Sequence, residues 1–529
     1  MKNEQVKQMM NGAFLLSLAA FIAKILSAVY RVPFQNMVGN TGFYVYQQVY
    51  PLYGIGMTFA LSGFPVFFSK RIASVAEAEH KQLVRDSLMI LSLFSLAIFG
   101  LLYGFAPFIA ERMGDVLLAP IIQSVSWMFL FMPVLATFRG FFQGSYRMKP
   151  TAVSQVSEQL IRVLVILAAA FWFTRSNTMN LYEMGARAMS GAAIGALVSA
   201  ALLGWWMRKE MPMKELRVQK GSSRNTFFSL LRGYATEGTV ICLLTSILVL
   251  FQLVDSFTLY KGLVENGWVE ETAKSLKGIY DRGQPLVQLG MVVGTGFSAS
   301  FIPLMSRAYL AERRDEFHRA ARSLIRITAA FSFAAVAGLL AILPEVNVML
   351  FGDGDGNAVL SVYIISIAIA SVMMAYHSIL QSYQQYRLTL YALGLGIFVK
   401  YVMNQLLVNY WDTLGASAAT LLGLLAMVWL MGRNLPLSLK GVWQKDRFGF
   451  KITGGAFLLF GGAIFTKTML RMLFFPELTR TSAMIVAICT VLIGVLLFGV
   501  YLLKVKVFTI REWLSLPLGK KILRFRGKE

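Results

Sequence analysis

The sequence has few of the residue types on which enzyme and metal sites most often depend. Cysteine occurs only at Cys242 and Cys489, both within apolar runs, which argues against a disulfide framework and a thiolate metal site. The three histidines, His80, His318 and His377, are scattered without metal-ligand spacing. No Walker motif, GxSxG elbow or HExxH motif occurs. We therefore expect neither ATP hydrolysis nor metalloprotease chemistry, and no enzymatic activity.

Charged residues are also scarce, at 15% of the chain compared with roughly 25% in soluble proteins. Hydrophobic residues make up 57%, and the mean hydropathy is +0.61. Apolar runs of about 20 residues, the length of a membrane-spanning helix, recur along the chain. The sequence therefore predicts an all-α polytopic membrane protein. We place about fourteen transmembrane helices at residues 12–35, 44–68, 87–109, 117–138, 153–174, 186–206, 235–259, 285–305, 324–344, 358–382, 388–409, 413–432, 449–469 and 481–503.

The formal charge of +23 would suggest nucleic acid in a soluble protein, but here the positions of the cations decide its meaning. Segments on the side of the two termini hold 36 lysines and arginines, and segments on the other side hold 10. The positive-inside rule then places both termini in the cytoplasm of a multi-pass protein of the bacterial cytoplasmic membrane. We expect anionic membrane lipids, and no nucleic acid, as partners of this charge.

An internal repeat predicts two six-helix lobes in parallel pseudo-repeat, followed by two C-terminal helices. Pro65 and Pro303 are separated by 238 residues, as are Gln143 and Gln381. Each pair occupies corresponding places in corresponding spans, as expected for a duplicated transporter. The predicted domains are an N-terminal lobe (1–206), a cytoplasmic basic linker (207–232), a C-terminal lobe (233–434), and spans thirteen and fourteen with a basic cytoplasmic tail (435–529).

Four cations, Lys24, Arg31, Arg162 and Lys400, fall inside the predicted spans. Lys24 and Arg31 are about two helical turns apart and share one helix face, and Lys400 lies 238 residues after Arg162. Charges inside a membrane usually face a protein-lined or watery cavity, so we interpret the four as a cationic cavity for an anionic headgroup. The alternatives are snorkelling and internal ion pairing, for instance of Arg162 with Glu158 one turn earlier.

Asp255, within LVLFQLVDSFTLY of the seventh span, is the clearest buried carboxylate. It could bind a coupling Na⁺ or H⁺, or it could balance the charge of the cavity cations, as could Glu158. An ion pair with one of those cations is the structural alternative. Apart from such a coupling ion, we expect no cofactor and no metal.

Several stretches resemble a known family of membrane proteins. RGFFQGSYRMKPTAVSQVSEQLIRV (139–163) and KGIYDRGQPLVQLGMVVGTGFSASFIPLMSRA (277–308) resemble the polysaccharide-transporter branch of the multidrug/oligosaccharidyl-lipid/polysaccharide (MOP) exporter superfamily. The resemblance extends to the stage V sporulation protein B type and to lipid II flippases. It implies two six-helix lobes around a central cavity and alternating access. It also implies functional cations early in span one, where Lys24 and Arg31 fall, and at the start of span two. Span two has no cation before Lys70.

The resemblance and the buried cations together predict a flippase. Its expected substrate is an undecaprenyl-pyrophosphate-linked saccharide, such as the peptidoglycan precursor lipid II. One alternative is a cation-coupled multidrug antiporter of the same superfamily, although cavities for cationic drugs favour acidic residues. Another is a non-transporting scaffold whose partners are cell-envelope synthesis enzymes.

Overall fold

A computed structural model describes residues 2–210 and 224–516 of the chain. These residues form helices and connecting turns, and no strand occurs among them. The centre of the predicted basic linker and the end of the predicted basic tail lie outside the described residues. The chain divides into two compact units, Met1–Asp281 and Arg282–Glu529, and each is described by itself.

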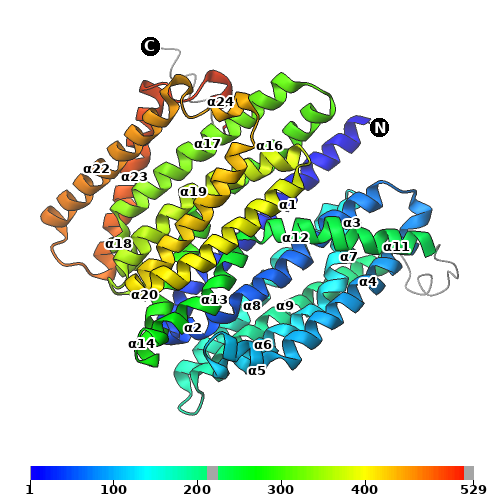
Figure 1. Cartoon of the computed structure of the whole chain (residues 1–529), viewed down its shortest axis with the longest axis horizontal. Helices are drawn as coiled ribbons and strands as arrows, with labels where there is room; N and C mark the ends of the chain where they lie inside the picture. The colour runs from blue at the N-terminus through cyan, green and yellow to red at the C-terminus, as the bar shows by residue number, and fades with distance from the viewer. Residues whose placement is uncertain (1, 211–223, 517–529) are drawn as a thin grey trace. The chain divides into compact units, whose positions relative to one another are not determined.

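The helices of the first unit follow one another with short connections, and their order can be traced in Figure 1. They are α1 (Lys2–Val29), α2 (Arg31–Met57), η1 (Thr58–Gly63), α3 (Phe64–Ala73), α4 (Glu77–Gly104), α5 (Ala106–Arg112), η2 (Val116–Leu118), α6 (Ala119–Ser126), η3 (Trp127–Phe131), α7 (Met132–Gly144), α8 (Met148–Arg175), α9 (Leu181–Glu210), α11 (Arg224–Gly233), η4 (Tyr234–Gly238), α12 (Thr239–Thr245), α13 (Ile247–Glu265) and α14 (Glu270–Asp281).

The second unit is also helical, and its last two long helices, α22 and α23, lie side by side (Figure 1). Its elements are α15 (Gly283–Gly290), α16 (Val292–Leu310), α17 (Arg314–Ala341), α18 (Leu343–Phe351), α19 (Asn357–Ser382), α20 (Tyr386–Arg433), α21 (Leu437–Lys440), η5 (Lys445–Arg447), α22 (Phe448–Phe474), α23 (Arg480–Lys504) and α24 (Ile510–Leu514).

Eleven candidate spans in the described part of the chain are long and apolar enough to cross a membrane. Two of them contain a break in the helical backbone, so each corresponds to two predicted spans. Leu15–Ala73 is interrupted at Gly39, where φ is 71°, and α20 is interrupted at Asp412, where φ is 47°. Positive φ values interrupt a right-handed helix. The all-α polytopic membrane fold is confirmed, whereas the count of fourteen and the lobe boundaries stay predictions.

The long helices bury their polar side chains and expose apolar ones, the arrangement that a bilayer requires. On α23, for example, Leu492, Val495 and Leu496 are exposed, whereas Thr490 is buried. Large apolar side chains are exposed on many of the other long helices as well. The chain is therefore a multi-pass membrane protein.

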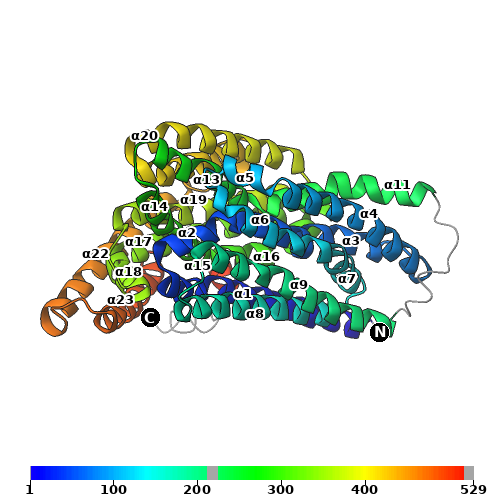
Figure 2. The ribbon, with the colours of Figure 1, turned by 90° about the horizontal axis from the view of Figure 1, so that it is seen from below.

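Close packing of α8 on α9 builds the framework of the candidate site, and the two helices lie side by side in both views (Figures 1 and 2). Glycine permits this approach. A Cβ atom on Gly195 would lie 2.7 Å from the carbonyl oxygen of Glu158, and one on Gly191 would lie 3.0 Å from that of Arg162. Helix α1 packs on the same helix α8. The three helices thus bring residues far apart in sequence around Arg162.

Candidate functional site: two buried arginines in a tyrosine cage

Helix α2 presents a row of tyrosines to the interior of the first unit. Tyr46, Tyr50 and Tyr53 recur at intervals of four and three residues, which places them on one helix face. All three are buried, as is Tyr30 at the junction between α1 and α2. We name the following group the arginine–tyrosine cage: Arg31, Arg162, Tyr30, Tyr46, Tyr50 and Tyr53.

Arg162 on α8 lies between aromatic rings. Its guanidinium carbon is 4.4 Å from the ring centre of Tyr53 and 5.0 Å from that of Tyr30. Nη1 donates to the hydroxyl of Tyr46 over 3.4 Å, and Nη2 donates to that of Ser27 on α1 over 3.3 Å. Aromatic faces stabilise a cation by roughly 0.5–2 kcal/mol without removing its charge. Arg162 therefore keeps its full positive charge in the protein interior.

Arg31 is the second cation of the cage, and its side chain is completely buried. Its guanidinium carbon lies 4.4 Å from the ring centre of Tyr50. None of its three side-chain nitrogens makes a hydrogen bond of normal geometry with the described residues, although Tyr30 and Tyr50 interact with the charge. A buried charge without hydrogen bonds is costly, and buried unsatisfied groups are uncommon in native proteins. Such a group is a candidate for binding an anion.

The carboxylate nearest to Arg162 in sequence pairs with a different arginine. Glu158 accepts an ion-paired hydrogen bond from Nη2 of Arg139 over 2.6 Å, and both side chains are almost fully buried. Arg139 lies on α7, within the candidate span Val116–Gly144. The sequence places Arg139 directly after the fourth predicted span, which ends at residue 138, and the structure shows that its side chain is buried in the protein. Helix α7 continues past the predicted end of its span and carries Arg139 inward.

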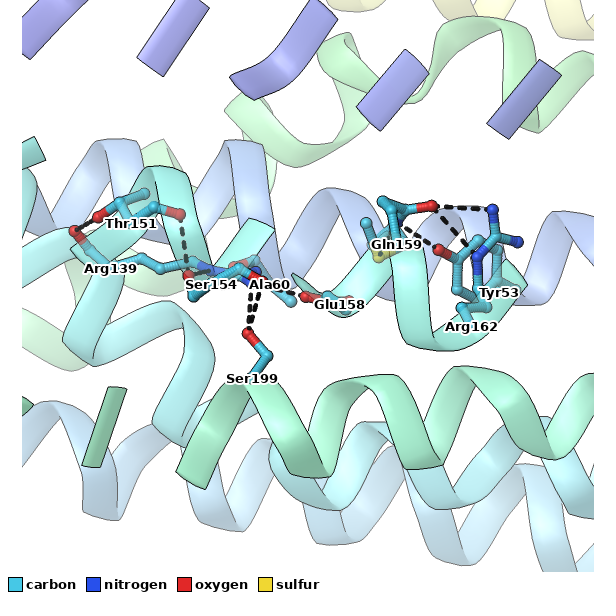
Figure 3. Close-up of polar contacts among 10 residues, drawn as sticks. Tyr53, Ala60, Arg139, Thr151, Ser154, Glu158, Gln159, Arg162 and Ser199 are labelled. Atoms are coloured by element: carbon cyan, nitrogen blue, oxygen red, sulfur yellow. Dashed lines mark hydrogen bonds and ion pairs between the residues drawn. The ribbon is translucent and has the colours of Figure 1, made fainter. Parts of the chain in front are cut away.

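Gln159 is the residue that holds the guanidinium of Arg162. Its side-chain oxygen accepts hydrogen bonds from Nε and Nη2 over 3.2 and 2.8 Å. Its side-chain nitrogen donates to the hydroxyl of Tyr53 over 2.9 Å. Figure 3 shows this group and the Arg139–Glu158 group as two separate clusters along α8. In the described part of the chain, neither Arg31 nor Arg162 forms an ion pair.

Asp255 belongs to a further polar group of the first unit. Its carboxylate accepts a hydrogen bond from the hydroxyl of Tyr280 over 2.8 Å, and it is buried. On the same helix as Tyr280, Lys277 pairs with Asp281 over 2.6 Å. Burial and the charge of Asp255 raise the pKa of Asp281 above its ordinary value, although Lys277 and Arg31 act to lower it. Acidic groups therefore lie within electrostatic range of Arg31, but Asp281 is already paired with Lys277.

The other two predicted cations, Lys24 and Lys400, are not members of the cage defined above. Lys24 is on α1 and is exposed, although it is only seven residues before the buried Arg31. Lys400 is on α20 in the second unit, where its ammonium donates to Thr420 over 2.6 Å and to the carbonyl of Ala416 over 3.3 Å. Within the first unit, the structure brings Arg31 and Arg162 together around the same tyrosines. No group of three or more potential metal ligands occurs among residues 2–210 and 224–516.

Comparison with known proteins identifies the family. Residues 9–309 match the family described as "Polysaccharide biosynthesis protein", and residues 278–406 match the MatE family. The "Uncharacterized membrane protein YabM" of Bacillus subtilis (strain 168) is 38% identical over 516 residues, which cover 97% of this chain and 96% of that protein. The chain belongs to the polysaccharide biosynthesis protein family. The predicted membership of the MOP exporter superfamily is confirmed, and so is a non-enzymatic transporter fold.

Two further similarities concern lipid II flippases. The "Lipid II flippase MurJ" of Bacillus subtilis (strain 168) is 26% identical over 443 residues, which cover 79% of this chain and 81% of that protein. The solved structure "Lipid II flippase MurJ, inward closed conformation" aligns with a TM-score of 0.66 at 13% identity, covering 92% of this chain and 98% of that one. The similarity to this solved structure establishes that the two proteins share a fold.

Proposed function

We propose that the protein is a flippase that translocates an undecaprenyl-pyrophosphate-linked saccharide, such as lipid II, across the cytoplasmic membrane. The observation that carries the proposal is the pair of buried guanidinium groups, Arg31 and Arg162, neither of which forms an ion pair with a carboxylate among the described residues. Family membership and the similarity to a lipid II flippase support the same substrate class.

The chemistry of the cage suits a pyrophosphate group. A guanidinium offers a planar fork of donors that matches phosphate oxygens, and it stays charged in any environment. In Arg31 none of those donors makes a hydrogen bond of normal geometry with the described residues, and none pairs with a carboxylate among them. A pyrophosphate would supply acceptors and negative charge at once, so its binding would relieve the cost of two buried cations.

The lipid character of the substrate fits a transporter that need not enclose the whole molecule. The charged headgroup cannot cross hydrocarbon unaided, whereas a prenyl tail can remain in the bilayer. In the proposed cycle, alternating access exposes the cage first to one side and then to the other. Both termini lie in the cytoplasm in this proposal, because the cations are concentrated on that side.

Lys24, Lys400 and Asp255 are assigned supporting roles in this proposal. The two lysines extend the cationic path of the headgroup in the two lobes. Asp255 binds a coupling Na⁺ or H⁺ or balances the cage charge together with Glu158. Flipping that loses its dependence on an imposed Na⁺ or H⁺ gradient in Asp255→Asn would identify the coupling role. A dependence equal to that of the wild type would contradict it.

A cation-coupled multidrug antiporter is the second candidate, because residues 278–406 match the MatE family. The cage argues against it, since cationic drugs would be repelled by two arginines. The two functions can be separated by measuring the protection of membranes or cells against cationic dyes and drugs. Protection by this protein, together with inactivity toward lipid-linked pyrophosphates, would favour the antiporter.

The proposed function is tested with the variants Arg31→Met and Arg162→Met, which keep an unbranched apolar stem but remove the guanidinium group and its charge. Each should lower the flipping rate of a fluorescent pyrophosphate-linked saccharide in proteoliposomes at least about tenfold, the change expected when roughly 1.4 kcal/mol of interaction is lost. Arg187→Met is the matched control, because Arg187 is exposed and stacks on Trp172. Full activity of both cage variants would contradict the proposal.

A further inference from the structure

The polar residues beside the cage keep a carboxylate away from Arg162. Glu158 precedes Arg162 by four residues on α8, the spacing at which acidic and basic side chains commonly pair on a helix. Its carboxylate instead binds Arg139 over 2.6 Å. The local sequence would neutralise Arg162, and the tertiary structure prevents this.

Arg139 is held firmly in the position that sequesters Glu158. Nε donates to Ser154 over 3.1 Å, Nη1 donates to the carbonyl of Ala60 over 3.1 Å, and Nη2 donates to Ser199 over 2.9 Å. These partners come from α8, η1 and α9, as Figure 3 shows. Every nitrogen of the Arg139 guanidinium therefore has a partner. Oε2 of Glu158 is engaged in the ion pair, whereas its Oε1 has no hydrogen-bond partner among the described residues.

Gln159 takes the place that an acidic residue would occupy beside Arg162. It accepts two hydrogen bonds from the guanidinium and donates one to Tyr53. A neutral amide fixes the orientation of the guanidinium without cancelling its charge. A carboxylate at the same position would form a charge-assisted pair and compete with any anionic ligand.

We infer that Gln159 is a positioning residue for Arg162, and that Arg139 masks Glu158 so that the cage retains its selectivity for anionic headgroups. The inference rests on the proposed function and names the residues that set its charge selectivity. The ionisable groups hydrogen-bonded to Gln159 are Arg162 on its own helix and Tyr53 on α2.

The test compares two probes that differ only in the headgroup, farnesyl pyrophosphate and farnesol, binding to the full-length protein in nanodiscs. The wild type should prefer the pyrophosphate. Gln159→Glu should weaken binding of the pyrophosphate about tenfold or more, the factor for roughly 1.4 kcal/mol, and leave farnesol binding unchanged. Gln159→Met, which loses the hydrogen bonds but adds no charge, should have a smaller effect.

A second arm of the test uses the masking pair. Arg139→Met should lower the preference for pyrophosphate, because the released Glu158 can reach Arg162. Adding Glu158→Gln to that variant should restore the preference, even if overall stability remains below that of the wild type. Restoration by a second neutral substitution would not follow from a purely structural role of Arg139.

The outcomes separate this inference from the proposed function. A wild-type protein that does not distinguish the two probes overturns the proposed function and the inference with it. A wild type that prefers pyrophosphate, with an equal preference in Gln159→Glu, overturns only the role of Gln159. Equal weakening of the binding of both probes in Gln159→Glu would indicate a structural role of Gln159 and would also overturn its role as a positioning residue.

Discussion

Removal of Arg139 should destabilise the first unit more than removal of both members of its ion pair. Arg139 is 0% exposed and Glu158 is 2% exposed, and their atoms are 2.6 Å apart. Arg139→Met would leave a buried carboxylate without its counter-charge and the hydroxyls of Ser154 and Ser199 without one donor. Breaking a buried pair by removing one partner costs about 3–5 kcal/mol.

The double variant Arg139→Met/Glu158→Gln tests the reasoning because it removes the unpaired charge. It should lose only about 1–3 kcal/mol, the range for a buried polar group left without its partner. The double variant should therefore be more stable than the single one. The stability of Arg139→Lys should lie between those of the single and the double variant, because an ammonium keeps the charge but cannot reproduce the contacts of the guanidinium with Ala60, Ser154 and Ser199.

The assay is reversible unfolding of the purified protein in detergent, followed by tryptophan fluorescence, for the wild type and the variants with Arg139 and Glu158 changed singly and together. The cycle yields the coupling energy between the two side chains. Arg139→Met with wild-type stability would refute the assignment of a buried pair. A double variant less stable than Arg139→Met would refute the argument that an unpaired carboxylate causes the loss.

Three further predictions concern packing, pH and the C-terminal segment. Gly195→Val should destabilise the protein by about 1–3 kcal/mol through overpacking, because a Cβ at this position would lie 2.7 Å from the carbonyl oxygen of Glu158. Gly204→Ala on the same helix is the near-neutral control, since a Cβ there would have no atom within 4 Å. Equal unfolding midpoints of the two variants would contradict the packing of α8 on α9. Burial opposes ionisation of Asp353, but hydrogen bonds from Arg282 and from the Asp355 amide hold its pKa below the ordinary 3.8. The stability that these bonds contribute is therefore present above pH 3.8, and it is lost as the pH falls through the lower pKa of the folded state. Asp353→Asn should show a smaller acid-induced fall in melting temperature than the wild type, and an identical pH profile would disprove this. Arg326→Met should speed proteolysis near α24, because Arg326 binds the carbonyl of Val507 over 2.5 Å and the carboxylate of Glu512 over 3.1 Å. Arg319→Met is the control, since Arg319 is exposed on the same helix. Equal cleavage rates of the two variants would count against these contacts.

The membrane fold could be predicted because hydropathy is a local property. Apolar runs of the right length recur whatever their neighbours are, and the predicted gap between residues 35 and 44 contains the observed break at Gly39. The break between predicted spans eleven and twelve likewise coincides with Asp412. In both cases the interruption of a long apolar run was visible in the sequence itself.

Burial of individual charges could be predicted only in part, because it depends on which helices pack together. Lys24 and Arg31 share a helical register, yet one is exposed and the other is buried. Arg139 directly follows an apolar run, so hydropathy alone predicts that it lies in a loop. Its burial depends on Glu158 and Ser199, which approach only when α7, α8 and α9 are packed.

The tyrosines of the cage had a local signal that sequence reasoning did not use. Tyr46, Tyr50 and Tyr53 follow the spacing of one helix face, and Gln159 lies one turn before Arg162. The spacing does not reveal which helices pack against this face. Only the packing of α1 and α8 shows that the rings surround two arginines.

The central claim, that the buried cations carry a pyrophosphate headgroup across the membrane, is tested most directly by reconstitution of the pure protein. Proteoliposomes would contain a fluorescent undecaprenyl-pyrophosphate saccharide, and the fraction accessible to an external quencher would be followed with time. The wild type should exchange the lipid between leaflets, and Arg31→Met/Arg162→Met should exchange it no faster than protein-free liposomes. Wild-type vesicles that exchange nothing, or a double variant as fast as the wild type, would contradict the account.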